Sequence, residues 1–371
     1  MMTEKKWIGA VAIVSVVLVG LLSAGILLQT GQPTGDTIQI TDMLGRQVEV
    51  PDEAQKVAGL GIGAIRTLVY LETTDRIVGC SATDKKLNDT LPYLLAQPEI
   101  TDLPEIESSE SVNMESIVSL DPDVIIASYY SVADADRIQE DTGIPVVVVR
   151  PGEGASEPLN YSSESNDFYR SVRIVGNLTN KQDRAEDIVS YIKALVDDLD
   201  QRTASIAEGS KPNVYVGGLS RKGPHGLTMT QRKYPPFVLT RSKNVAGDVQ
   251  APSNTVEIDS EQLISWDPDI IFVDEVNLPL VVEDITDPKF SNLTAVINEE
   301  VYGVFPYPRY GLNHGVVFAN SYYVGKVLYP EQFSDVNVTQ KADEIFAFLI
   351  GEPVYDIMEE DMGGYTRLNL E

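Results

Sequence analysis

Two segments of the chain, 115–125 and 261–271, have nearly the same sequence. They read ESIVSLDPDVI and EQLISWDPDII, and six of the eleven positions are identical. Each copy is expected to begin as a short helix that ends at Asp-Pro-Asp, because proline cannot continue a helix. An apolar run follows, 124–127 or 270–273, and such a run is typical of a strand buried on both faces of a parallel sheet. The repeat therefore predicts one structural unit built twice, once in each of two lobes.

Short strands and helices alternate around each copy. Residues 38–42 and 47–50 alternate apolar and polar side chains, which predicts a β-hairpin. Gly59, Gly61 and Gly63 predict a tight strand-to-helix turn, since their spacing differs from the G-x-G-x-x-G of dinucleotide-binding loops. Further buried strands are expected at 57–60, 77–80, 146–149 and 213–217. Because strands and helices alternate, we expect parallel α/β lobes.

A long helix is expected between the two copies. Residues 183–207 keep apolar side chains at a spacing of 3.6, and no Gly or Pro lies between Gly176 and Gly209. A helix of about 25 residues would be about 37 Å long, enough to reach from one lobe to the other. A shorter helix from Asp167 is expected to precede it. The predicted organisation is an N-terminal anchor or signal at 1–28, a linker at 29–36, a first lobe at 37–166, an interlobe helical segment at 167–208 and a second lobe at 209–371.

The N-terminal segment predicts a membrane location. Lys5 and Lys6 precede 7–28, which carries no charged residue. About 20 apolar helical residues span the hydrocarbon core of a bilayer, and the basic flank favours the cytoplasmic side. Residues 29–371 are then expected outside the cell. A cleaved signal peptide, with secretion of the rest, is the alternative.

Composition excludes several classes of protein. The chain has 56 acidic and 28 basic residues, a net charge of −28, which argues against nucleic-acid binding. It has two histidines and one cysteine, Cys80, so neither a histidine-rich zinc site nor a cysteine metal cluster is expected, and no metal ligands are assigned. We find no nucleophile elbow, P-loop or comparable catalytic motif, and we do not expect an enzyme.

Two windows lack acidic residues, 219–247 and 301–330, although the chain as a whole is acidic. Both begin where an expected strand ends, and ligands of open α/β sheets bind beyond the carboxyl ends of the strands. Basic and aromatic side chains suit an anionic, partly planar ligand. The aromatic residues near 322–328 have helical spacing and are expected in the core. The candidate ligand contacts are Arg66, Tyr129, Tyr130, Arg221, Lys222, His225, Tyr307, Arg309 and Tyr310.

The two copies, the opening TDMLGRQVEVP at 41–51 and the ending ANSYYVGKVLYPEQF at 319–333 carry a resemblance. Over about residues 37–355 the chain resembles the substrate-binding proteins of ABC importers for iron–siderophore, haem and cobalamin complexes. The resemblance implies two Rossmann-like α/β lobes with parallel sheets, joined by one long rigid α-helix, with the ligand cleft between them. It also implies docking of a surface Glu on each lobe, here Glu115 and Glu261, onto an ABC permease dimer with a cytoplasmic ATPase. An N-terminal anchor would replace the lipid-bearing cysteine of bacterial members, as in archaeal relatives.

The expected function is that of an extracytoplasmic receptor. It would capture a chelated metal complex, a ferric siderophore first and haem or a corrinoid next, and deliver it to the permease. No cofactor is needed, because the metal would arrive with its own ligands. Three alternatives stay open: a receptor of the same fold for a free metal ion, a receptor for an oxyanion, and a surface sensor.

Overall fold

The computed structural model of the chain describes residues 36–86, 91–152, 160–219, 223 and 225–370. They belong to one compact unit that begins at Pro33. The expected anchor or signal at 1–28 and nearly all of the linker at 29–36 lie outside the described residues. Within the described ranges, no helix is both long enough and apolar enough to cross a membrane.

The N-terminal lobe is built on a parallel sheet with the strand order β5-β4-β3-β6-β7. β6 and β7 are buried along their whole length, as apolar strands covered on both faces should be. The expected hairpin is present as an antiparallel pair, β1 and β2. The strands of this lobe are β1 (Thr37–Thr41), β2 (Gln47–Pro51), β3 (Val57–Leu60), β4 (Ile77–Ser81), β5 (Glu105–Glu107), β6 (Val124–Ser128) and β7 (Val146–Val149). Its helices are α1 (Ala64–Tyr70), α2 (Pro92–Ala96), α3 (Met114–Leu120) and α4 (Val132–Thr142).

The C-terminal lobe contains a second parallel sheet, with the order β10-β8-β12-β13. β9 and β11 form a separate antiparallel pair, and in the sequence β10 stands between them. The strands are β8 (Asn213–Gly217), β9 (Met229–Gln231), β10 (Lys243–Asn244), β11 (Thr255–Glu257), β12 (Ile270–Asp274) and β13 (Val301–Val304). The helices are α7 (Pro235–Leu239), α8 (Ser260–Trp266), α9 (Leu278–Ile285), α10 (Thr294–Ile297), α11 (His314–Leu328), α12 (Val338–Ile350) and α13 (Tyr355–Met362).

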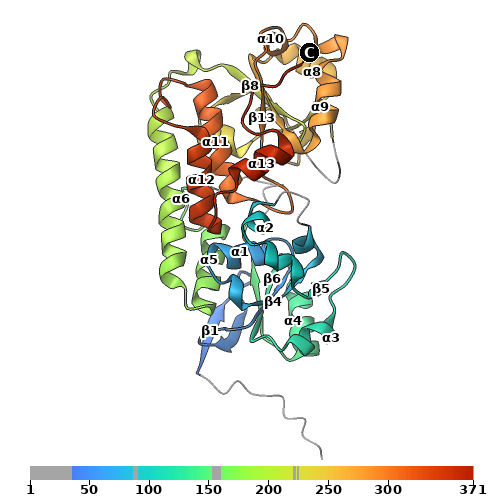
Figure 1. The fold of residues 1–371 in the computed structure, drawn as a ribbon, viewed down its shortest axis with the longest axis vertical. Coiled ribbons are helices and arrows are strands. Elements are labelled where there is room, and N and C mark those ends of the chain that lie inside the picture. Colours follow the sequence, from blue (N-terminus) through green and yellow to red (C-terminus); the bar gives the residue numbers. More distant parts are fainter. Residues whose placement is uncertain (1–35, 87–90, 153–159, 220–222, 224, 371) are drawn as a thin grey trace, which may run out of the picture. The chain divides into compact units, whose positions relative to one another are not determined.

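Two helices join the lobes, α5 (Asp167–Leu178) and α6 (Gln182–Thr203). Figure 1 shows α6 running beside α11 and α12, and α6 packs on α5 on the side of the N-terminal lobe. Arg184 of α6 donates hydrogen bonds to the Tyr70 carbonyl of one lobe and to the Phe348 carbonyl of the other. α6 ends four residues before the expected 207, because the chain turns after Thr203 and Ile206 packs against the core.

The two copies of the repeated sequence occupy equivalent places. β6 pairs with β3 and β7, and β12 pairs with β8 and β13. In each copy the first Asp of Asp-Pro-Asp ends the helix in the left-handed region, with φ of 50° at Asp121 and 42° at Asp267. The second Asp accepts backbone hydrogen bonds from the start of the neighbouring strand segment: Asp123 from Lys56 N–H (2.8 Å), Asp269 from Asn213 N–H (2.7 Å). The prediction of one unit built twice is confirmed.

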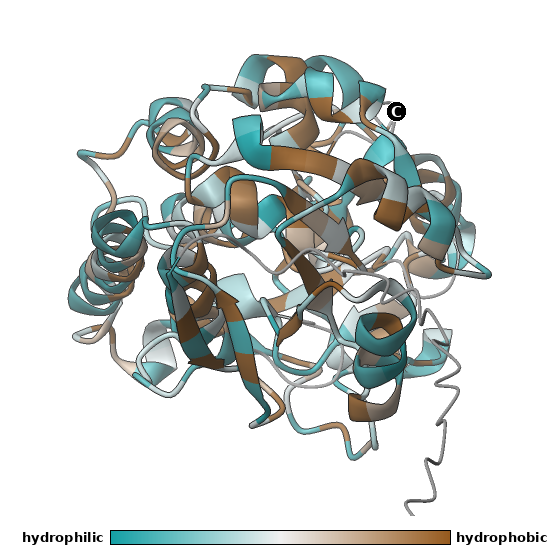
Figure 2. Cartoon of the chain, turned by 90° about the horizontal axis from the view of Figure 1, so that it is seen from below, coloured by the Kyte–Doolittle hydropathy of each residue, from teal (hydrophilic) through white to brown (hydrophobic). Residues whose placement is uncertain are grey.

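Hydrophobic residues concentrate on the strands and on the inward faces of the helices, as the brown segments of Figure 2 show. One cluster continues from the N-terminal lobe through α5 and α6 into α11 and α12. Tyr322 and Tyr323, which were expected in the core, are buried there. The two connecting helices, α5 and α6, therefore pack into the core of both lobes.

Candidate functional site

The turn after β3 is tied to the carboxyl end of β6. Gly61 has a φ of 74°, and a Cβ at this position would lie 2.4 Å from the Ser128 carbonyl oxygen, so only glycine fits. The Ser128 hydroxyl donates to the Ile62 carbonyl at 2.7 Å. The expected tight strand-to-helix turn is present, and it brings the 61–63 backbone beside Tyr129.

Glu107 links this turn to Tyr130. One carboxylate oxygen accepts from the Tyr130 hydroxyl at 2.5 Å, and the other accepts from the Gly61 N–H at 2.5 Å. Burial, followed by the hydrogen bond to Glu107, raises the pKa of the Tyr130 hydroxyl well above its usual value. The sequence argument missed Glu107, which lies outside both acid-free windows. Its place at the end of β5, at the same sheet edge as Gly61, was the available signal.

Arg66 bridges the two lobes. It lies on α1, is 4 % exposed, and donates to the carbonyls of Tyr310 (2.8 Å) and Leu312 (2.9 Å) in the C-terminal lobe. Its guanidinium carbon lies 5.0 Å from the centre of the Tyr93 ring. Both terminal nitrogens therefore hold the 310–312 backbone, and Arg66 and Tyr310 are two expected site residues that the fold brings together.

Lys86 and Tyr310 meet at the same junction. The Lys86 ammonium group donates to the Tyr310 hydroxyl at 2.8 Å and lies 4.5 Å from the centre of its ring. Tyr310 is half-buried and has a φ of 46°, a left-handed conformation that tyrosine adopts rarely. Lys86 is exposed, and sequence reasoning missed it because it stands outside both windows. The result is a cation beside an aromatic ring at the lobe boundary.

A neutral histidine forms a second joint between the lobes. His314, the first residue of α11, is buried, and burial lowers its pKa to about 3. The Nε2 atom lies 2.7 Å from the Pro151 carbonyl, so it carries the proton and donates. Nδ1 then accepts from the Tyr161 hydroxyl at 2.8 Å. The ring stacks on Phe168 with a centroid distance of 3.7 Å. His314 thus connects a C-terminal helix to two segments near the end of the N-terminal lobe.

Two other expected contacts lie in the loop after β13. Tyr307 is fully buried, and its hydroxyl donates to Gln231 at 2.5 Å, so the structure places it in the core. Arg309 is half-buried, and its carbonyl accepts from the Asn313 side chain at 3.0 Å. The charge of Arg309 opposes the increase in the pKa of Asp274, which burial raises to about 7.

The remaining expected contacts belong to the first acid-free window. Arg221 and Lys222 lie outside the described residues. His225 is half-buried and takes part in an interaction of its own. The window follows β8 directly, so these residues begin at the carboxyl end of a strand, as do Tyr129 and Tyr130 in the other lobe.

Two buried carboxyl groups lie at the carboxyl end of β12, Asp274 as its last residue and Glu275 directly after it, and sequence reasoning missed both. Asp274 accepts from the Val276 N–H at 3.1 Å, whereas neither oxygen of Glu275 makes a well-formed hydrogen bond. Burial, followed by the neighbouring Asp274, raises the pKa of Glu275 to about 9, and the nearby Gly364 N–H offsets little of this. A Cβ on Gly303 would lie 2.3 Å from Glu275 Oε1. Glu275 is therefore a tightly enclosed, protonated side chain at neutral pH.

Glu115 and Glu261 occupy matching places on the two lobes. Each is exposed and lies in the first turn of its helix, α3 or α8. The caps also correspond: Asn113 accepts from the Ser116 N–H at 3.0 Å, and Asp259 accepts from the Gln262 N–H at 2.7 Å. An acid in the first turn is favoured by the helix dipole, by about 0.3–1 kcal/mol.

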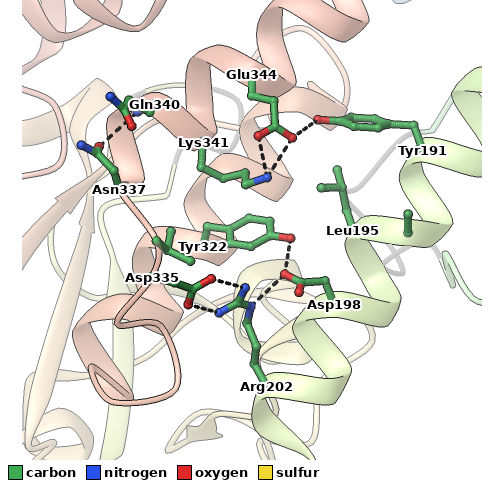
Figure 3. Close-up of a pocket in the computed structure, with 12 residues that line it drawn as sticks. Tyr191, Leu195, Asp198, Arg202, Tyr322, Asp335, Asn337, Gln340, Lys341 and Glu344 are labelled. Carbon is green, nitrogen blue, oxygen red and sulfur yellow. Dashed lines mark hydrogen bonds and ion pairs between the residues drawn. The ribbon is translucent and has the colours of Figure 1, made fainter.

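A hollow of about 470 Å³ lies between α6 and the pair α11–α12 (Figure 3). Its charged groups are bonded to one another: Arg202 to Asp335 and Asp198, and Lys341 to Glu344. The Tyr322 hydroxyl donates to Asp198 at 2.7 Å. Because these groups satisfy each other, we interpret the hollow as the seam that fastens α6 to the C-terminal lobe.

The described side chains thus place cations and tyrosines where the carboxyl ends of the two sheets approach each other. In these ranges, no group of three or more His, Cys, Asp or Glu residues is placed to hold a metal ion. These groups offer hydrogen bonding, charge pairing and ring stacking, the contacts by which a protein holds a solute.

Comparison with known proteins shows to which family the chain belongs. Residues 57–307 match the family model described as periplasmic binding protein. The molybdate-binding protein MolA of Haemophilus influenzae is 24 % identical over 325 residues, which is 83 % of this chain and 89 % of that protein. Its molybdate-bound structure superposes with a TM-score of 0.67, at 20 % identity over 84 % of this chain and 98 % of that chain.

Other solved structures share the fold. A periplasmic solute binding protein from Veillonella parvula gives a TM-score of 0.70, with 22 % identity over 88 % of this chain and 97 % of that chain. The haem binding protein HmuT gives 0.53, with 16 % identity over 81 % and 93 %. The resemblance to the substrate-binding proteins of ABC importers and the two-lobed α/β fold are thereby confirmed. The chain belongs to the periplasmic binding protein family.

Proposed function

We propose that the protein captures an anionic, metal-bearing solute outside the cytoplasm and delivers it to an ABC permease. The observation that carries this proposal is the junction where Arg66 holds the 310–312 backbone beside the exposed Lys86. In a chain with a net charge of −28, a cation stacked on Tyr310 at the lobe boundary favours an anionic ligand. The protein acts as a receptor and performs no chemical step.

A chelated metal complex suits these groups best, with a ferric siderophore first and haem or a corrinoid next. Its flat parts would stack on Tyr129, Tyr130 and Tyr310, and its anionic groups would pair with Lys86 and Arg309. Arg221, Lys222 and His225 would contribute from the loop after β8. Tyr307 contributes indirectly, because its buried ring supports the loop that carries Arg309.

A metal oxyanion is the second candidate. It is favoured by the similarity to MolA, which is named for molybdate binding and aligns over 83 % of this chain. An oxyanion offers no flat surface, so hydroxyl groups and cations would hold it. A bare metal ion fits less well, because the expected contacts supply few metal-ligating side chains.

Titration calorimetry of the full chain tests the proposal. The ligands are a ferric siderophore, haem, a corrinoid and molybdate, and we expect one of them to bind one per chain with micromolar or tighter affinity. Binding of none of them, or of a bare divalent metal ion alone, would contradict the proposal.

Variants of the junction separate the two candidates. Lys86→Met should weaken binding of either ligand about tenfold, the loss expected for one charge-assisted contact. Lys289→Met is the matched control, since Lys289 also lies over a ring, Phe290, at 4.9 Å but outside the junction. Tyr310→Phe should spare binding of a planar chelate and weaken that of an oxyanion, whereas Tyr310→Ala should weaken both.

Glu115 and Glu261 would dock the loaded protein onto the two halves of a permease that an ATPase drives. Reversing both charges, Glu115→Lys with Glu261→Lys, should abolish uptake and leave the ligand affinity unchanged. Glu140→Lys with Glu331→Lys is the control, because both residues are exposed acids outside the repeated segments. Reduced ligand affinity in the first variant would instead indicate a structural role for the two acids.

A further inference from the structure

The two repeated helices expose the same kind of aliphatic side chain. Val118 on α3 is 50 % exposed, and Ile264 on α8 is 42 % exposed. Both stand three residues after the Glu of their copy, at equivalent positions of the repeat. Side chains three residues apart in a helix are neighbours on one face. Each lobe therefore presents a carboxylate and an aliphatic group side by side.

The fold explains several other shared positions of the repeat but not these two. Ile117 and Leu263, one residue earlier, are fully buried and pack in the cores of their lobes. Asp123 and Asp269 hold the start of the neighbouring strand segment. No such role within a lobe accounts for an aliphatic residue that is about half exposed. Ser119 and Ser265, which follow, are also exposed in both copies, so the likeness extends across the outer face.

We infer that Val118 and Ile264 are the apolar anchors of two equivalent docking surfaces, one on each lobe. The occupant is a membrane protein with two equivalent halves, each offering a basic side chain to the Glu and an apolar recess to the aliphatic group. This inference rests on the proposed function and adds the residues that hold the permease once charge has brought it near.

Two observations favour this partner. The same pair of exposed groups occurs twice in one chain, and a partner with two equivalent halves meets both copies with one kind of surface. In the described residues, neither Glu115 nor Glu261 forms an ion pair, so both carboxylates are available to a cation. Charged groups at an interface mainly steer association, whereas buried apolar anchors hold the complex.

Single thiol probes can test the inference, because the natural thiol is inert. Cys80 is fully buried, and burial raises its pKa to about 12. A cysteine introduced at the surface is then the reactive one. Val118→Cys and Ile264→Cys in the full chain would be labelled with benzophenone maleimide in native membranes and irradiated. Matched controls are Val238→Cys and Ile357→Cys, since these residues are 53 % and 46 % exposed but lie on α7 and α13.

We expect the probes at 118 and 264 to attach to the same multispanning polypeptide, within the same peptide of it. The two control probes should give no such product. Attachment to two different proteins, or yields no higher than those of the controls, would overturn the inference.

Recovery of the permease with the full chain provides a second readout. Val118→Asp with Ile264→Asp should lower the recovery about tenfold, as for an interface anchor, with an unchanged thermal midpoint. Val238→Asp with Ile357→Asp should not lower it. If Glu115→Lys with Glu261→Lys abolishes recovery and the aspartate pair at 118 and 264 does not, the anchors are wrong and the proposed function stands. If the unaltered chain recovers no ABC permease, both the proposed function and the inference fail.

Discussion

At the scale of single residues, Arg66 fastens the N-terminal lobe to a loop of the C-terminal lobe. Its two terminal nitrogens hold carbonyls of the other lobe, and its guanidinium stacks on Tyr93. The Tyr93 hydroxyl in turn donates to the buried Asp84 at 2.7 Å. A polar network of the N-terminal lobe thus orients the residue that fixes the loop carrying Tyr310.

Arg66→Met should loosen this loop. It removes two charge-assisted hydrogen bonds, each worth about 1.5–3 kcal/mol, and leaves two carbonyls without their donors. We expect faster amide hydrogen exchange at 310–313 and a lower free energy of unfolding. Arg170→Met is the control, since Arg170 is half-exposed on α5 and its one ion pair among the described residues is with Asp167 of its own helix. Unchanged exchange at 310–313 would show that Arg66 does not hold the loop.

Glu275 should make the protein less stable as pH rises. The pKa of its carboxyl is 4.5 in the unfolded chain and about 9 in the folded one, so folding is favoured by the bound proton. This contribution is complete below about pH 4.5 and is lost as pH rises toward 9. Glu275→Gln keeps the shape of the side chain but is neutral at every pH, so folding no longer requires the uptake of a proton. It should raise the free energy of unfolding at pH 8 by about 1–3 kcal/mol and make that free energy depend less on pH. Urea unfolding at pH 5 and pH 8 measures both effects, and a parallel pH dependence in the variant would refute the assignment.

At the scale of elements, the second Asp of each Asp-Pro-Asp fastens one strand segment to the next. Asp123→Ala should cost about 1–3 kcal/mol of unfolding free energy, because the N–H groups of Gln55 and Lys56 lose their acceptor. Asp269→Ala should act in the same way on Asn213. Asp141→Ala, on the exposed face of α4, should change stability by less than about 0.5 kcal/mol. Denaturant unfolding of the three variants checks this, and equal effects would contradict the bracing role.

The elements were predictable where local pattern decides them. The hairpin, the buried strands and the shorter helix from Asp167 follow from apolar spacing and flanking residues. The end of α6 was not predictable from the sequence. Ile206 keeps the apolar spacing of the helix but packs against a core that forms only when the rest of the chain has folded. Sequence pattern gives the period of an element, and tertiary packing decides its last turn.

At the scale of the whole molecule, the place of the site was more predictable than its members. The rule that ligands lie at the carboxyl ends of parallel strands pointed to the loops where the structure gathers the candidate cations and tyrosines. It could not show that the Arg66 side chain would hydrogen-bond to backbone carbonyls of the other lobe, or that the Tyr307 side chain would be buried in the core. Lys86 gave no local signal, because its partner Tyr310 lies 224 residues away in the sequence. The only signal for Glu107 was its place at the end of β5, and its partner Gly61 lies 46 residues away.

On the proposed function, this member of the periplasmic binding protein family carries an anionic, metal-bearing solute. The most direct measurement is elemental analysis and visible spectroscopy of the full chain purified from its native cells without added ligand. We predict one metal atom per chain, released together with its chelating or oxo ligands when the protein is denatured. A chain that retains a bare metal ion, or an organic solute without any metal, would contradict the account.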